Sequence, residues 1–386
     1  MRLSKEELTQ KIHDNQCKYS LSWSKLHCFI DDPFSFKLKY LDHIPEERSN
    51  SYAFLGDVVH SGLESFYKNE KTIDEIIEIF ENKMAEQSLS NVNFVKDKEK
   101  NKQIEQNYYQ NIKHFFKNYE KVSPLSNLEI FVGWKFDDYF MQGYVDHMYP
   151  IEKEGIVVIE DFKTSTLYQG EKIEKNSGQL KLYAYMISKM YNIPISKIRI
   201  GWNFLKYVMI DIKQKNGNIK TTKCLRNEIP KTIYSKLKTW GKHFKYTSEE
   251  VEDFYKIIEK NSLDYKDKNI FDGVPDEISE KFNIRDCFVN IDCTEEIIDT
   301  FIKYVYDNIK EMTDKIALYK VTKNDELFWK EVTKENSFFF INLCGYTSKN
   351  HKPLREYLNK ISEFEKESTD TDNLDPTILD FIFNNK

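Results

Sequence analysis

The sequence lacks the features that mark membrane-spanning, secreted and disulfide-stabilised proteins. Its 386 residues contain no run of about eighteen apolar residues, the length that a membrane-spanning helix needs. The N-terminal segment MRLSKEELTQKIHDNQ has no apolar stretch, so we expect no signal peptide. The six cysteines are scattered and form no CxxC pair, which favours reduced thiols over a disulfide framework. These absences predict a cytoplasmic protein, in a host cytoplasm if a phage encodes it.

The sequence also has no glycine-rich phosphate-binding loop, no internal repeat and no long low-complexity tract. What is present is typical of a folded, soluble chain, since 40% of the residues are hydrophobic and 15% are aromatic. A chain of this length can bury one large core or two moderate ones.

Charge is distributed unevenly along the chain. The net charge is -6, yet residues 197–246 contain thirteen Lys or Arg against only Asp211 and Glu228, so this segment carries +11 and the remainder -17. Such a segment is either a solvated face or a surface that faces phosphates. We expect Lys206, Lys213 and Lys215 in this segment to contact DNA.

The spacing of apolar residues changes from helical to strand-like after residue 120. Helices are expected first, with a break at Pro33 in the earliest, over residues 18–41, 56–68, 73–84 and 98–119. Strands are expected over 128–134, 139–151, 156–162, 199–212 and 219–225, with a helix at 177–191. This order predicts an α/β fold in which helices flank a central mixed sheet, after an N-terminal helical region.

The C-terminal part gives a weaker signal. Residues 230–245 read as a basic helix, and the acidic composition of 247–280 indicates a boundary or linker. We therefore expect a core domain over residues 1–250 and a mostly helical C-terminal region over 251–386, for which the sequence suggests no role.

Two neighbouring expected strands carry acidic residues near their ends. Side chains alternate along a strand, so Asp161 and Lys163 share one face while Phe162 points into the core. Asp146 joins them if residues 152–155 close a hairpin. Two carboxylates and one ammonium are what metal-assisted phosphodiester hydrolysis requires: the carboxylates hold a hard cation, and the lysine acts on the water or on the developing charge. This is the candidate active site.

These residues also have ordinary interpretations. Asp146 is compatible with a hairpin turn, and Asp161 with Lys163 is compatible with a surface ion pair worth at most about 1 kcal/mol. The apolar flank 157–159 favours instead a buried strand that emerges into a cleft. Glu160 is expected to point the other way, with a structural or solvent-facing role.

Five ordered pieces of the sequence resemble one known family. They are Ser22-x-Ser24 with Asp32-Pro33-Phe34-x-Phe36-x-x-x-Tyr40, then Gly56-x-x-x-His60, Gly143-x-x-Asp146, Asp161-x-Lys163 and Gln179-x-x-x-Tyr183. Their order and spacing resemble the RecB-like branch of the PD-(D/E)xK nucleases over residues 18–210. The Asp32-Pro33-Phe34 variant looks most like phage or mobile-element members.

The resemblance implies a restriction-endonuclease-like core and a divalent-metal-dependent DNA nuclease, with an exonuclease that leaves 5′-phosphate ends as the preferred form. By resemblance, His60, Asp146 and Asp161 bind Mg²⁺ or Mn²⁺, and the Phe162 carbonyl is a further ligand. Lys163 then positions or activates the attacking water.

The resemblance also assigns roles beside the metal. Gln179 and Tyr183 lie four residues apart, on one face of the helix after the Asp-x-Lys triplet, and are expected to orient Lys163 and the scissile phosphate. Glu129 sits where some family members carry an additional acid.

Several assignments leave an alternative open. His60 is compatible with a core histidine, and Gln179 with Tyr183 is compatible with a polar edge and a packed aromatic. Ser22 and Ser24 either contact phosphate or cap and pack. The aromatic residues of the later strands either stack on bases or belong to the core, as strand aromatics more often do; they are Trp202, Phe204 and Tyr207.

Some relatives hold an iron–sulfur cluster with four cysteines. Here Cys28 lies in the corresponding region and Cys287 is followed by Cys293, but a fourth ligand is missing, so we expect no cluster. The expected partner is DNA, with a homo-oligomer or a recombination or replication protein as further possibilities and no membrane. The alternative function is a nuclease-fold protein that binds DNA or scaffolds a complex without cleaving.

Overall fold

The computed structural model describes residues 2–48, 51–90, 92–95, 98–263 and 269–369. The chain forms two compact units that interleave along the sequence. The larger unit comprises Met1–Trp23 and Ser51–Tyr306, and the smaller comprises Ser24–Asn50 and Asp307–Lys386. The sequence had suggested a single boundary near residue 250. The assignment of function to 1–250 and 251–386 remains a prediction, because compactness alone does not say where an activity resides.

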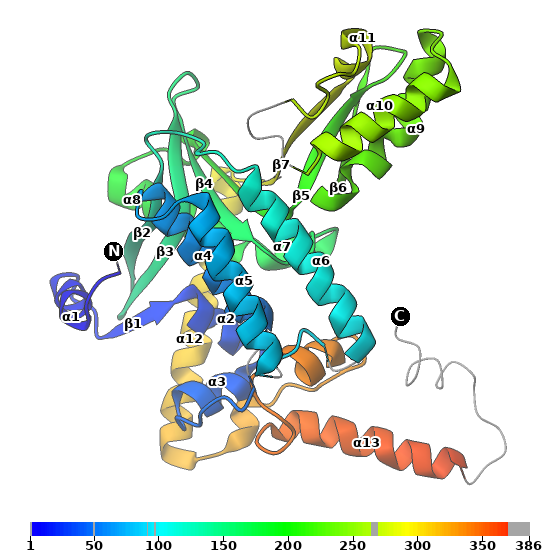
Figure 1. Ribbon diagram of the computed structural model, residues 1–386. Helices are drawn as coiled ribbons and strands as arrows, with labels where there is room; N and C mark the ends of the chain where they lie inside the picture. The colour runs from blue at the N-terminus through cyan, green and yellow to red at the C-terminus, as the bar shows by residue number, and fades with distance from the viewer. Residues whose placement is uncertain (1, 49–50, 91, 96–97, 264–268, 370–386) are drawn as a thin grey trace. The chain divides into compact units, whose positions relative to one another are not determined.

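The larger unit begins with helices. Helix α1 (Lys5–Asp14) starts at a capping box formed by Ser4 and Glu7. Helices α4 (Ser51–Tyr67), α5 (Ile73–Leu89) and α6 (Lys98–Lys117) pack in sequence order, α4 on α5 and α5 on α6 (Figure 1). Their apolar faces meet in one buried cluster that includes Leu55, Phe80 and Phe116. The helical interpretation of this part of the sequence is confirmed.

A seven-stranded mixed sheet follows, which confirms the predicted fold class. The strands are β1 (Tyr19–Ser22), β2 (Asn127–Phe136), β3 (Tyr139–Ile151), β4 (Ile156–Lys163), β5 (Ile198–Lys213), β6 (Ile219–Leu225) and β7 (Phe282–Ile291). The central order is β1-β3-β4-β5-β6, with β2 paired to β3 and β7 paired to β5. Strands β1 and β3 are parallel, as are β4 and β5, and the other pairs are antiparallel.

Helices pack against the strands that carry the candidate site. Phe162 of β4 and Leu205 of β5 belong to the apolar cluster of α4, α5 and α6. Helix α7 (Glu171–Asn176) leads into α8 (Gly178–Tyr191), which contacts β2, β4 and β5. Because strand side chains alternate, the positions next to Phe162 face away from that cluster.

The second half of β5 supports a separate group of helices. Helices α9 (Ile229–His243), α10 (Ser248–Asn261) and α11 (Asp276–Ser279) pack with β5 and β7 in a second apolar cluster. The prediction that 247–280 is a linker is therefore wrong for the described residues of this range; 264–268 lie outside them. Helix α10 begins at a capping box of Thr247 with Glu250 and buries Val251 and Ile258. These features are present in the sequence, but the acidic composition outweighed them.

The smaller unit is helical. It contains most of α2 (Trp23–Asp31), α3 (Pro33–Tyr40), the end of α12 (Glu295–Thr322) and α13 (Lys352–Thr369). Between α12 and α13 lie a 3-10 helix (Asp325–Phe328) and a π-helical turn (Phe339–Leu343). Two further 3-10 turns, Ile195–Lys197 and Arg226–Glu228, belong to the larger unit. No helix among the described residues is long and apolar enough to span a membrane.

Candidate active site

The candidate acids lie where the β3–β4 hairpin ends its regular pairing. The turn between the strands includes Gly155, whose φ of 62° is a left-handed conformation that glycine adopts without strain. The antiparallel register runs to His147 opposite Glu160, and Asp146 and Asp161 are the next residue on each strand. The hairpin thus brings the two aspartates to neighbouring positions, as the sequence predicted.

Asp161 and Lys163 form a close ion pair. The Lys163 Nζ lies 2.5 Å from Asp161 Oδ2, and their side chains are 25% and 5% exposed. Burial opposes the charged form of Lys163, but attraction to Asp161 and then to Asp146 outweighs it and raises the pKa of Lys163 above its usual value. Lys163 is therefore a cation at neutral pH.

His60 of α4 reaches the same strand ends. Its Nε2 lies 3.0 Å from the Phe162 carbonyl oxygen, and its Nδ1 lies 3.5 Å from Asp146 Oδ2. A carbonyl oxygen only accepts, so Nε2 carries a proton and donates it to Phe162, and Nδ1 is the ring nitrogen that faces Asp146. The Phe162 N–H donates to the same Asp146 oxygen at 3.0 Å. A cation between Nδ1 and this carboxylate would take the place of any proton on Nδ1.

Glu129 of β2 completes this group. Ligand atoms of His60, Glu129 and Asp146 lie within 4.8 Å of one another. Glu129 has a φ of 51°, an uncommon conformation for a residue with a Cβ, and the pairing of β2 with β3 passes from Leu128 to Ile130 without it. Arg2 contacts it, with its Nε 3.4 Å from Glu129 Oε2. The three-residue group therefore contains Glu129, whereas Asp161 is turned to Lys163.

Asp146 has a strongly altered acidity. Burial, followed by repulsion from Asp161, raises the pKa of Asp146 to about 7, against attraction from His60 and Lys163 and the hydrogen bond from the Phe162 N–H. A carboxyl that titrates near neutral pH, in a group of converging ligands, is typical of functional sites.

Gln179 and Tyr183 of α8 lie beside the strands. The Gln179 Nε2 donates to the Tyr183 hydroxyl at 3.0 Å. Burial raises the pKa of Tyr183 to about 12, with Asp146 and Asp161 adding to the rise against the hydrogen bond from Gln179. A Cβ at position 143 would lie 2.7 Å from the Tyr183 ring, so Gly143 is needed for α8 to approach β3. This contact gives a structural reason for the glycine in the Gly143-x-x-Asp146 piece.

A buried pair lies directly beside the two aspartates in sequence. His147 Nδ1 is 2.5 Å from Glu160 Oε2, and both residues are almost completely buried. The His147 ring stacks on Phe162 with a centroid separation of 5.4 Å. Glu160 is thus structural, one of the two roles that the sequence left open. The pair connects β3 to β4 on the face of the sheet that α4, α5 and α6 cover.

The residues expected to contact DNA are dispersed. Ser22 ends β1, and Ser24 belongs to the smaller unit. Lys206 is only 7% exposed, its Nζ lies 5.3 Å from the Tyr108 ring centroid, and burial lowers its pKa to about 8. Lys213 ends β5 and Lys215 follows in the turn, both exposed.

The aromatic residues of β5 are largely core. Trp202 and Phe204 are 1% and 0% exposed, and both contact the Tyr168 ring edge-on. Their burial favours packing over base stacking, while Tyr207 is half-buried.

A second group of metal-ligating side chains lies in the smaller unit, where the sequence gave no signal. Ligand atoms of Asp32, Cys344 and His351 lie within 4.8 Å of one another, and all three residues are buried. His351 Nε2 lies 3.0 Å from Asp32 Oδ1, and its Nδ1 accepts from the Leu354 N–H. Both ring nitrogens are thus engaged, and Asp32 also caps α3 through the Ser35 N–H. This group joins two helix N-termini and leaves no lone pair of His351 for a cation.

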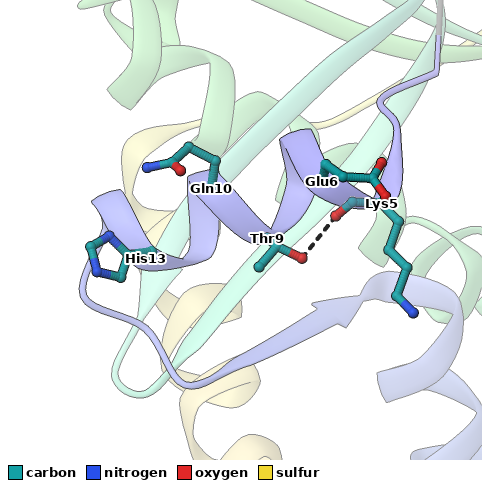
Figure 2. Close-up of a pocket in the computed structure, with 5 residues that line it drawn as sticks. All are labelled: Lys5, Glu6, Thr9, Gln10 and His13. Atoms are coloured by element: carbon teal, nitrogen blue, oxygen red, sulfur yellow. Dashed lines mark hydrogen bonds between the residues drawn. The ribbon is translucent and has the colours of Figure 1, made fainter.

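A surface hollow on α1 is unrelated to either group. It is lined by Lys5, Glu6, Thr9, Gln10 and His13 (Figure 2). All five residues are exposed, and the Thr9 hydroxyl is used in a bond to the Lys5 carbonyl of its own helix. The hollow contains none of the candidate catalytic residues.

Comparison with known proteins agrees with the geometry. A crystal structure described as "Putative exonuclease" from Eubacterium rectale matches with 11% identity and a TM-score of 0.30, over 61% of this chain and 82% of that one. A likeness that low carries no argument. No curated protein sequence matches significantly. The family model described as PD-(D/E)XK nuclease superfamily matches residues 20–276, a range that contains His60, Asp146, Asp161 and Lys163. The chain therefore belongs to the PD-(D/E)XK nuclease superfamily.

Proposed function

We propose that this protein is a divalent-metal-dependent DNA nuclease that acts as an exonuclease and leaves 5′-phosphate ends. The observation that carries the proposal is the convergence of His60, Glu129 and Asp146 beside the Asp161–Lys163 pair. Membership of a nuclease superfamily supports the reaction class. Preference for DNA ends comes from the sequence resemblance to the RecB-like branch.

The donor atoms fit Mg²⁺ or Mn²⁺. Carboxylate oxygens suit both ions, and one imidazole is compatible with Mn²⁺. The Nε2–H group of His60 donates a hydrogen bond to the Phe162 carbonyl, the arrangement that usually orients a histidine whose other nitrogen binds a metal. His60, Asp146 and Glu129 would hold the ion, with Asp161 joining if it leaves Lys163. When bound, the ion supplies charge stabilisation and lowers the pKa of water.

The protein's own groups have distinct roles in this proposal. Lys163 carries a positive charge, so it places the water and neutralises charge on the phosphate oxygens rather than removing a proton. Tyr183 stays protonated, and because its oxygen accepts from Gln179, its hydrogen is free to point at the phosphate. The Phe162 carbonyl orients His60 instead of serving as a direct ligand.

DNA contacts are proposed at Ser22, Ser24, Lys206, Lys213 and Lys215. The exposed Lys213 and Lys215 suit phosphate contacts that are independent of sequence. The weakly solvated Lys206 gains its full charge more readily when an anion approaches it.

The test measures cleavage of linear and circular DNA with Mg²⁺, Mn²⁺ or excess EDTA. Wild-type protein should shorten linear DNA from its ends in either metal and should be inactive in EDTA. Asp161→Ala and Lys163→Ala should each lower kcat by about 100- to 1,000-fold, as expected when one group that stabilises the transition state is removed. Wild-type activity in both variants would refute this site, and cutting of circular DNA would refute the exonuclease form.

A further inference from the structure

Helix α9 carries lysines on a single exposed stripe. Lys231, Lys238 and Lys242 are exposed, and their spacing of seven and four residues places them within about 40° of one another around the helix. Along the axis they span about 16 Å. Ser235 and Thr239, which are also exposed, lie among them. This lysine stripe therefore offers cations and small hydroxyl side chains and no acid.

The lysines of the stripe form no ion pair with acids among the residues that the structure describes, and Lys238 instead lies 4.0 Å from the Tyr234 ring centroid. Lysines on other helices do pair with acids one turn away, as Lys83 does with Glu86 and Lys315 with Glu311. Like charges four residues apart, as in Lys238 and Lys242, repel each other. The Tyr234 hydroxyl beneath Lys238 donates to Glu252 of α10, so an acid lies near the stripe without pairing with its lysines. The three ammonium groups are therefore available to an external anion.

The opposite face of α9 is fixed in place. Ile229, Ile233, Leu237 and Trp240 are buried in the apolar cluster that also contains Val208 and Ile210 of β5. Pro230 stands in the first turn, where its missing N–H costs nothing. The stripe is therefore a rigid surface whose lysines are not needed for packing.

The same strand connects this surface to the candidate active site. Phe204 of β5 is paired with Lys163 of β4, and Ile210 contributes to the cluster beneath α9. Between these positions the pairing of β5 with β7 shifts register from Asn203 to Val208, which marks a bulge in the strand. The lysine stripe and the candidate active site therefore belong to one unit and share one strand.

We propose that the lysine stripe of α9 binds the sugar–phosphate backbone of the same DNA whose scissile phosphate enters the candidate active site. This inference rests on the proposed function for the identity of the anion. The spacing of the lysines suits a regular row of phosphates, and contacts of this kind position DNA without reading its sequence. Its effect is on affinity and its salt dependence rather than on the chemical step.

The experiment compares two triple variants of the full chain that change the net charge equally. K231Q/K238Q/K242Q removes the stripe, and K83Q/K256Q/K315Q removes one exposed and two partly buried lysines that pair with acids. Binding to a duplex of about 30 base pairs is followed by fluorescence anisotropy in EDTA, between about 50 and 200 mM salt. The stripe variant should lose about 2 to 3 from the slope of log K against log salt, since each phosphate contact contributes about 0.9. The control variant should lose less than about 1.

Equal slopes for the two variants would overturn the inference. It would also be overturned if the wild-type protein bound anionic lipid vesicles as tightly as it binds DNA. If the triple stripe variant unfolds, K238Q alone should change the slope by about 0.9, and an unchanged slope would count against the stripe. A wild-type protein that binds DNA with a steep slope but never cleaves it would refute the nuclease proposal and leave the stripe intact.

Discussion

The two units each contain a histidine beside a carboxylate, buried in the smaller unit and partly buried in the larger, but their hydrogen bonding differs. In the smaller unit, His351 uses both ring nitrogens, one toward Asp32 and one toward the Leu354 N–H. In the larger unit, His60 uses Nε2 for a carbonyl and presents Nδ1 to Asp146 at 3.5 Å. His351 is fully buried, whereas the His60 side chain is 30% exposed.

This difference separates a group that is closed to ligands from one that is open to them. A polar cluster whose donors and acceptors are all paired has nothing left to offer a ligand, and its removal costs stability. A cluster with converging ligand atoms and partial access to solvent is where we propose that a cation binds. Removing one residue of the Asp32–His351 group is therefore expected to lower stability. Removing one residue of the Asp146–His60 group is expected to lower activity.

The largest expected effect is that of His60→Ala on activity. This change removes the only ring nitrogen in the proposed ligand group and should lower kcat by about 100- to 1,000-fold. Mn²⁺ affinity, measured by calorimetry, should fall, while the midpoint of thermal unfolding of the metal-free protein should stay close to wild type because His60 is partly exposed. A large fall in that midpoint with normal Mn²⁺ affinity would make His60 a core histidine.

The next effect is on stability, through Asp32→Ala. The substitution leaves the buried His351 without its partner and removes the cap of α3, so the free energy of unfolding should fall by about 3 to 5 kcal/mol. Mn²⁺ affinity of the folded protein should not change. Asn324→Ala, which removes an exposed cap in the same unit, is the matched control and should cost about 1 kcal/mol. Equal losses in the two variants would contradict the structural role of the Asp32–His351 pair.

The smallest expected effect is on pH dependence, where the two carboxyls should behave oppositely. The pKa of Asp146 is raised to about 7, so protons compete with the metal, and Mn²⁺ affinity should rise up to about tenfold per pH unit below 7 and then level off. Because this folded pKa exceeds the unfolded value, Asp146 stabilises the metal-free fold at low pH, and that contribution is lost as pH rises toward 7.

For Asp32 the sign is reversed. Burial opposes ionisation of this carboxyl, but the hydrogen bond and attraction from His351 together with the hydrogen bonds from Ser35 outweigh it and lower its pKa below the ordinary value of 3.8. Its contribution is present above that value and is lost as pH falls through the lower, folded pKa. Asp146→Asn should abolish the pH dependence of Mn²⁺ affinity and leave the acid unfolding unchanged. A dependence that persists in this variant would assign the titration to another group.

Much of the fold follows from local patterns. The strand periodicity predicted β2 to β6 to within a few residues, and the apolar spacing predicted the helices before them. Alternation along β4 placed Asp161 and Lys163 on one face, where the structure pairs them. The sequence missed α1, β1, β7 and α10, and β1 (Tyr19–Ser22) lies in the range 18–41 that was expected to be helical. In α10 an acidic composition outweighed a capping box and a short apolar pattern.

The chain's own sequence thus determined the elements, the family and the pairing of Asp161 with Lys163, because each depends on residues close together along the backbone. Only the tertiary structure decided that Glu129 joins His60 and Asp146, and that His351 meets Asp32 across 319 residues. Such contacts depend on the path of the folded chain and on how the elements of each unit pack together. Local spacing carries no record of that path, so two histidines that look alike in sequence acquire different roles.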